Sequence, residues 1–451
     1  MVSSWFDRPL GARDHTSARA THQRENAVTD GAKLYPFFEA PQVRMSRAGT
    51  LAVAMLLIAI PATAQTFRPP DPANRPWTTA KMNIGPIYFA PTFELSGVGV
   101  DNNVFNDEQD PKDDITGTLG MRSLIGIHFG EPFVLQITQN NTYHYYRRYR
   151  SERSIDSGLN FTLEFRTKFF RPWARWNRVK TSQRLGFEID ERAERKTPTF
   201  DFGADINAAF RLGVSVAARR NRLRFKDTEA YKGQNLSETL DQVNDAYQGL
   251  IRYQVTELSE LIAGADYTRD RFPKSPDRNN DSRYFYGGLR IKTGATFTGT
   301  ATVGYRQQDH VKAGVPDFKG VTADVDMSVT PSEAFKLDVQ GGRDMGYSYI
   351  EAYPFIVEQG AGATLTNRFA EHFDVVLSAR GRWLKYDETM TGAKLPYTER
   401  TVVLGLGSGY FVGGGTGTRL GLLYERWQRV SPADGRSFHD NRISSNYRFS
   451  F

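Results

Sequence analysis

The stretch FDFGADINAAFRL at residues 200–212 alternates apolar and polar side chains along most of its length. Successive side chains of a β-strand point to opposite faces, so a period of two predicts a strand with unlike faces. Here one face runs from Phe200 to Leu212 and is apolar, while the other carries Asp201, Asp205 and Arg211. The same pattern recurs in residues 155–166, 297–306 and 321–329.

Connections between such segments alternate in length. Short turns fall near residues 130–132, 211–213, 256–258, 293–295, 331–333 and 413–415, and longer polar loops span residues 101–113, 185–198, 226–239, 272–281 and 387–398. Outer-membrane barrels have short periplasmic turns and long extracellular loops. The sequence therefore predicts an all-β fold, a transmembrane antiparallel up-and-down β-barrel of about eighteen strands. Sixteen strands would also fit, because residues 169–184 and 214–226 carry Arg and Lys on both faces.

The eighteen strands are expected to start near residues 87, 115, 133, 154, 169, 199, 214, 240, 259, 282, 296, 319, 334, 355, 373, 400, 417 and 439. A soluble β-sandwich has shorter strands, and a β-solenoid would show a fixed repeat, which the sequence lacks. The absence of cysteine excludes a disulfide scaffold and a zinc site built on thiolates. A single long apolar run argues against a helical membrane protein.

That run, residues 51–61, follows Arg47 and precedes Ala62-Thr63-Ala64, a pattern typical of a secretory signal peptide. The alternative is a cytosolic tail on an uncleaved anchor. We expect four segments: residues 1–44 as a disordered upstream extension that precedes the true start at Met45, 45–64 as the signal peptide, 65–85 as a periplasmic lead-in, and 86–451 as the barrel.

The chain ends in ISSNYRFSF at residues 443–451, which places Tyr447, Phe449 and Phe451 on one face of the last strand. This ending resembles the terminal-strand signal of outer-membrane proteins, which the barrel-assembly machinery recognises. A barrel must also pair its last strand with its first, so that no strand edge stays open in lipid. We therefore predict that these three aromatic residues form an assembly signal.

Residues 95–105, LSGVGVDNNVF, resemble the first strand and turn of the putative beta-barrel porin family of Gram-negative bacteria. The overall plan, with a signal peptide and a terminal phenylalanine, is also similar, so the likeness covers residues 86–451. The resemblance implies an outer-membrane β-barrel, and some members lie among exopolysaccharide biosynthesis genes. It supports fold and location more than cargo.

A barrel of sixteen to eighteen strands is wide enough for an aqueous lumen. The alternation predicts an inner face that carries Arg166, Arg211, Arg252, Arg290, Arg306, Arg380, Arg382, Arg442, Arg448, Asp324 and Asp326. Mixed charge on such a wall most often forms cross-strand ion pairs that brace the barrel. The alternative hypothesis is that rings of arginine favour anions.

The chain carries a net charge of +7. Arg147, Arg148, Arg150 and Arg153 gather among tyrosines beside a long loop, where they are expected to contact lipopolysaccharide phosphates and outer-membrane lipid. An exported barrel does not meet nucleic acid, so no nucleic-acid partner is expected.

Scattered histidines and the lack of a nucleophile motif argue against an enzyme, and no cofactor or metal is predicted. Two function hypotheses remain. The first is a porin or export channel for small anionic solutes or polysaccharide, with polysaccharide export components as partners. The second is a closed structural or adhesive barrel without conductance, in which the loop at 101–114 or the loop at 226–239 folds inward.

Overall fold

The computed structural model describes Ala80 and residues 82–130, 132–186, 188–207, 211–292, 296–350, 352–369, 372–387, 395–412, 418–433 and 435–450. The predicted extension at 1–44 and the signal peptide at 45–64 lie outside these residues, as does Phe451. No helix within the described part of the chain is long and apolar enough to cross a membrane.

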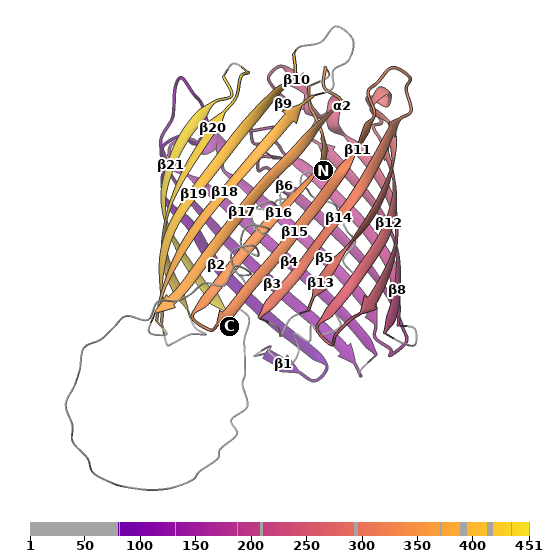
Figure 1. Ribbon diagram of the computed structural model, residues 1–451. Helices are drawn as coiled ribbons and strands as arrows, with labels where there is room; N and C mark the ends of the chain where they lie inside the picture. The colour runs from indigo at the N-terminus through magenta and orange to yellow at the C-terminus, as the bar shows by residue number, and fades with distance from the viewer. Residues whose placement is uncertain are drawn as a thin grey trace, which may run out of the picture.

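Eighteen antiparallel strands close into a barrel (Figure 1). They are β2 (Ile87–Asp101), β3 (Asp114–Phe129), β4 (Phe133–Tyr146), β5 (Ser154–Phe165), β6 (Phe170–Thr181), β7 (Arg195–Asn207), β8 (Leu212–Phe225), β11 (Gln242–Gln254), β12 (Ser259–Arg271), β13 (Asn280–Ile291), β14 (Phe297–His310), β15 (Phe318–Ser332), β16 (Phe335–Tyr347), β17 (Phe355–Phe369), β18 (Phe373–Tyr386), β19 (Tyr397–Phe411), β20 (Arg419–Val430) and β21 (Phe438–Ser450). The predicted barrel and the count of eighteen are confirmed, and each strand starts within about four residues of its expected position.

The seam of the barrel joins β2 to β21, from Thr92 opposite Ser450 to Asp101 opposite Arg442. A bulge interrupts this pairing at Gly97, which has a φ of 61°. Glycine adopts this left-handed conformation without the steric cost that a side chain would bring. The Gly97 backbone N–H donates to Asn446 Oδ1 at 2.9 Å, so the bulge itself is tied across the seam.

The outer surface of the barrel is apolar and the inner surface is polar. On β7, Phe200 and Phe202 are 47% and 52% exposed, whereas Asp201 and Asp205 of the same strand are 3% and 2% exposed. β14 and β15 alternate in the same way, as do the other strands with exposed apolar side chains. This inverted arrangement suits a wall that has lipid outside and a polar lumen inside.

Loops at the two ends of the barrel differ in length. The turns at one end are short, and the connections at the other end are longer and hold α2 (Leu236–Leu240) with the small hairpin of β9 (Ala230–Tyr231) and β10 (Gln234–Asn235). In Figure 1 these elements lie at the upper rim, whereas β1 (Met82–Ile84) lies below the lower one. β1 pairs with the start of β2, opposite Ile87 to Phe89, and thus covers the part of the β2 edge that lies beyond the pairing with β21.

Candidate functional site: the lumen wall and the loop cap

The inner wall carries a network of arginines and carboxylates on neighbouring strands. Across β12 to β19 the pairs are mostly one to one: Arg306 donates two hydrogen bonds to Asp344 at 2.7 and 2.8 Å, and Arg382 lies 3.5 Å from Glu358. The Arg306 guanidinium also lies over the Tyr284 ring, 4.6 Å from its centre. Each such pair satisfies a charge that the wall removes from bulk water.

Three more of the predicted arginines take similar positions. Arg290 lies 3.9 Å from Glu260, which also binds Lys292, and Arg380 lies 3.8 Å from Glu425. Near the seam, Arg442 contacts Asp101 at 3.1 Å and also pairs with Asp440.

The remaining predicted residues of the wall are placed by strand register. Arg448 stands opposite Glu94 of β2 and Arg419 of β20. Asp324 and Asp326 of β15 stand opposite Thr302 and Thr300 of β14, and Asp324 is buried.

Arginines outnumber carboxylates on one part of the wall, from β5 to β8 and β11. Asp205 of β7 lies 3.7 Å from Arg171 and 3.3 Å from Arg252, and Asp201 lies 3.9 Å from Arg175 and 2.6 Å from Arg219. These two carboxylates are therefore each shared by two guanidiniums, which leaves positive charge around them on this part of the wall.

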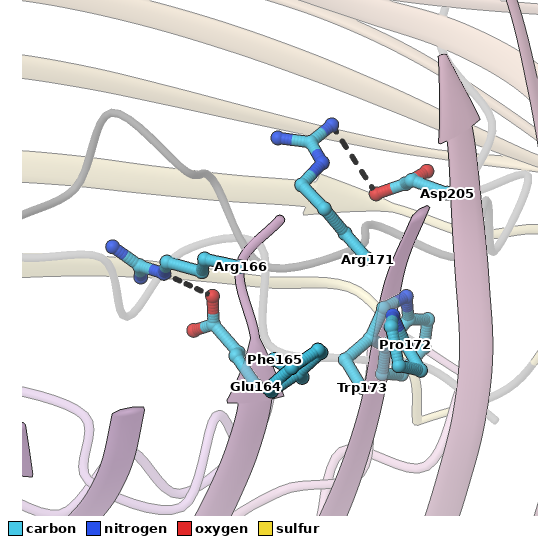
Figure 2. Close-up of a pocket in the computed structure, with 7 residues that line it drawn as sticks. All are labelled: Glu164, Phe165, Arg166, Arg171, Pro172, Trp173 and Asp205. Carbon is cyan, nitrogen blue, oxygen red and sulfur yellow. Dashed lines mark hydrogen bonds and ion pairs between the residues drawn. The ribbon is translucent and has the colours of Figure 1, made fainter. Parts of the chain in front are cut away.

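A pocket lies at the short-turn end of this basic wall, between the end of β5 and the start of β6 (Figure 2). Arg166 donates to Glu164 at 2.8 Å on one side, and Arg171 reaches toward Asp205 on the other. Figure 2 shows each of the two arginines turned toward its own carboxylate, with Trp173 beside them. Arg166 and Asp205 both line this pocket, and Asp205 is the carboxylate that Arg252 approaches.

Arg211 was expected on the inner face, and the structure corrects this placement. The strand β7 ends at Asn207, and Arg211 lies exposed in the turn before β8 with a φ of 68°. Its Nη1 donates to the Val255 carbonyl at 3.2 Å, which ties two neighbouring short turns together. The apolar–polar alternation in the sequence continues past Asn207, where β7 ends, so alternation alone placed Arg211 on the strand.

The long loops meet over one mouth of the barrel and form what we call the loop cap, the described residues of 182–194, 226–241, 348–354 and 431–437. An apolar cluster holds the cap together, with Ile189, Ala193, Tyr231, Leu236, Leu240 and Tyr349 packed against Leu223 and Phe225 of β8. Because these loops leave the wall at different sides of the barrel, their contacts cross the mouth. The loop at 226–239 therefore folds inward, as one of the two hypotheses required.

Arg436 is the central polar residue of the cap and is 4% exposed. Its Nη1 donates to Tyr349 Oη at 3.0 Å, and its Nη2 donates to the Glu188 carbonyl at 2.9 Å and to Glu399 Oε2 at 2.8 Å. Glu399, at the start of β19, also pairs with Arg429 of β20. One guanidinium thus links three loops to the wall.

Glu188 is the buried carboxyl of the cap. Ser348 Oγ donates to Oε1, and the Tyr349 backbone N–H donates to Oε2 at 3.1 Å. Burial raises the pKa of Glu188 to about 7, despite these hydrogen bonds and the nearby Arg436. The carboxyl therefore changes charge near neutral pH.

The first long loop also joins the cap. Val104 is fully buried, and its carbonyl accepts hydrogen bonds from Arg184 at 2.8 Å and Arg192 at 3.2 Å. Asn106 Nδ2 donates to Asp190 Oδ1 at 2.7 Å. The loop at 101–114 thus shares in closing the mouth.

The rim arginines lie at the same end of the barrel as the cap. Arg147, Arg148 and Arg150 are exposed, and Arg148 pairs with Asp113 at 2.7 Å. Arg153 instead bends back, donating to the Tyr146 carbonyl at 2.8 Å and lying over the Tyr145 ring. Three exposed arginines therefore lie on one rim.

At the end of β21, Tyr447 stands between Leu95 of β2 and Leu420 of β20 and is 38% exposed on the apolar outer face. Phe449 is paired by backbone with Phe93.

The cap residues were not predicted from the sequence, although a signal was present. The loop at 185–198 contains Leu185, Ile189 and Ala193, apolar residues that a fully solvated loop would not need. In the structure Ile189 and Ala193 are 2% exposed and Leu185 packs against their cluster. The polar partners, by contrast, carry no local signal, because Arg436 and Glu188 are 248 positions apart.

Several solved structures are similar to this chain at low sequence identity. OpdO of Pseudomonas aeruginosa is 13% identical with a TM-score of 0.47, covering 80% of this chain and 97% of that one. OccAB3 of Acinetobacter baumannii is 9% identical with a TM-score of 0.46, covering 80% and 99%. The siderophore receptor PirA of Pseudomonas aeruginosa is 10% identical with a TM-score of 0.41, covering 82% and 81%.

No curated protein matches the chain. The family model described as "Putative beta-barrel porin 2" matches residues 178–451, more than half of the chain. The matched region includes β7, β8 and β11 of the basic wall and all four loops of the cap. The chain therefore belongs to the putative beta-barrel porin 2 family and is a β-barrel of the outer membrane.

Proposed function

We propose that the chain forms a pore that prefers small anionic solutes. One observation carries the proposal: Asp205 and Asp201 are each shared by two arginines on the same part of the inner wall. A wall with more guanidiniums than carboxylates raises the local concentration of anions and lowers that of cations. Eighteen strands enclose enough width for water and ions.

Reversal potential in a planar bilayer tests this proposal. Under a potassium chloride gradient, we expect the sign of the reversal potential to show that chloride permeates faster than potassium. Replacing Arg171 and Arg175 by Gln should move the permeability ratio toward unity, whereas Arg382→Gln, on the part of the wall with paired charges, should change it less. Cation selectivity of the unmodified protein would overturn the proposal.

An acidic polysaccharide would be attracted by the same basic wall. The two cargoes give different signals in the same bilayer, because a small anion carries current while a threaded polymer blocks it. Reversible block by an acidic oligosaccharide would therefore favour export of a polymer, and undisturbed current would favour the small solute.

A closed structural barrel is the second candidate, and the loop cap favours it. Arg436, Glu188 and Glu399 hold several loops across one mouth, and an apolar cluster packs three of these loops together. A cap that never opens would give no conductance. Current that appears only after the cap is broken would identify a gated pore, while absence of current in both forms would support the structural role.

A further inference from the structure

We infer that a cluster beside the pocket at the short-turn mouth is a binding subsite for an oxyanion, the carboxylate or phosphate group of a small solute. The inference rests on the proposed anion pore and adds a place where the solute pauses. Its residues are Arg171 of β6, Asp205 of β7 and Arg252 of β11, with Gly213 and Ser215 of β8 between them. We call this set the mouth subsite.

Strand register brings these residues together. Asp205 stands opposite Arg171 on one side and opposite Ser215 on the other, and Ser215 Oγ donates to its Oδ1. Arg252 stands opposite Gly213, one strand further along. Its guanidinium therefore crosses β8 to approach Asp205.

Gly213 makes this crossing possible. A Cβ atom at residue 213 would lie 3.1 Å from Arg252 Nη2 and 3.2 Å from Nε. Both distances are tighter than most real contacts of a Cβ atom, so a side chain here would push the guanidinium away. The glycine leaves this space to the Arg252 guanidinium, whose Nη2 lies 3.3 Å from Asp205 Oδ1.

Hydrogen-bonding capacity in the mouth subsite exceeds what the described residues use. Arg252 is 9% exposed, yet its Nε and Nη2 make no hydrogen bond of acceptable geometry with any described residue. The Nε of Arg171 is also buried and likewise makes no hydrogen bond with any described residue. A buried N–H without an acceptor is costly, so an incoming oxygen atom would be bound favourably.

Charge points to the same class of ligand. Two guanidiniums share Asp205, and their mutual repulsion is only partly offset by one carboxylate. An oxyanion supplies the missing negative charge and can accept two hydrogen bonds from a planar guanidinium. The apolar ring of Trp173 lines the adjacent pocket, so a small organic body attached to the anion has a surface to pack against.

The position suits a solute in passage. Arg171 lies next to the turn that joins β5 and β6, and Arg252 lies two residues before β11 ends, so the subsite is at the short-turn rim. Outer-membrane barrels place this rim in the periplasm. An anion that has crossed the lumen would meet the subsite last.

Calorimetry on the purified full chain in detergent, with inorganic phosphate and with succinate as probes, tests the subsite without requiring current. We expect Arg252→Gln, Arg171→Gln and Gly213→Ala each to weaken binding, the first two by on the order of tenfold. Asp205→Asn should instead tighten binding by a similar factor, because it removes the carboxylate that competes with the probe. Arg382→Gln is the matched control, an inner-wall arginine on the other side of the barrel.

The Asp205→Asn variant separates binding from bracing, because a purely structural Asp205 gives no gain in affinity. Altered electrophoretic mobility of unheated samples checks that every variant is folded. Unchanged or weaker binding in a folded Asp205→Asn protein would overturn the subsite, as would equal losses in the Arg382→Gln control. Anion selectivity without a gain in affinity in the Asp205→Asn protein would support the anion pore and overturn the subsite. Binding of the probes at the subsite without conductance would support the subsite and overturn the pore.

Discussion

Replacing Arg436 by Gln should release the loop cap while leaving the barrel folded. Arg436 makes hydrogen bonds to Tyr349 Oη, the Glu188 carbonyl and Glu399 Oε2 at 2.8–3.0 Å, and glutamine is too short to reach all three. Breaking a buried ion pair costs about 3–5 kcal/mol. Because Glu399 keeps Arg429 and the Ser431 hydroxyl as partners, we take the lower end, about 3 kcal/mol.

A loss of about 3 kcal/mol raises the open fraction of the cap by on the order of a hundredfold, since 1.4 kcal/mol corresponds to a factor of ten. Hydrogen exchange of backbone amides measures this opening directly. The Leu236 amide, which donates to the Glu229 carbonyl at 3.0 Å, and the Tyr349 amide should lose protection, while amides in the middle of the strands should not. Single-channel records should show longer open times.

Arg150→Gln serves as the control, because it removes the same charge from the same end of the barrel and Arg150 is exposed. Equal protection of the cap amides in the Arg436→Gln protein and the unmodified protein would refute the reasoning. So would loss of protection throughout the strands, because the cap would then not be a separate unit.

Three further predictions concern the rim, the cap and the last strand. Burial raises the pKa of Glu188 from 4.5 to about 7, so folding of the cap binds a proton, and the free energy of opening the cap should fall by about 3 kcal/mol as pH rises from 4.5 to 7. Hydrogen-exchange protection factors of the cap amides should show this fall. A Glu188→Gln protein with the same pH dependence would contradict it. We propose that Arg147, Arg148 and Arg150 bind lipopolysaccharide phosphates. The variant with all three replaced by Gln should melt at a lower temperature than the unmodified protein in lipopolysaccharide-containing membranes but not in phosphatidylcholine. An unchanged melting temperature would mean that the arginines are only solvated. We also propose that Tyr447 is read by the barrel-assembly machinery, so Tyr447→Ala should lower the folded yield in cells with little change in urea stability of refolded protein; equal yields would argue against it.

The fold could be predicted from the sequence because each strand carries its own signal. A wall between lipid and water imposes a period of two on every strand, so Phe200 and Asp201 already reveal opposite faces without knowledge of their neighbours. Turn positions are less certain, because a polar residue after a strand can continue the alternation by chance. Arg211 is such a case.

The candidate site was predictable only in part. Inward arginines such as Arg252 and Arg306 follow from alternation, but which carboxylate each one meets depends on strand register. Arg171 was not singled out, because the β6 segment carries basic residues on both faces. The cap depends on contacts between loops far apart in the chain, such as Arg436 with Glu188, and no local pattern encodes them.

The seam between β2 and β21 determines when the barrel can be completed. Its hydrogen-bonded partners lie near residues 92 and 450, so the first strand must wait for nearly the whole chain to be synthesised and exported. Every other wall pairing joins neighbouring strands of the sequence and can form earlier, since short loops close quickly. Until the last strand arrives, β2 and the growing end of the sheet are open edges that can pair with other chains. The bulge at Gly97 fixes the register of that final step, and a chain that misses it would be an aggregation hazard rather than an incomplete pore.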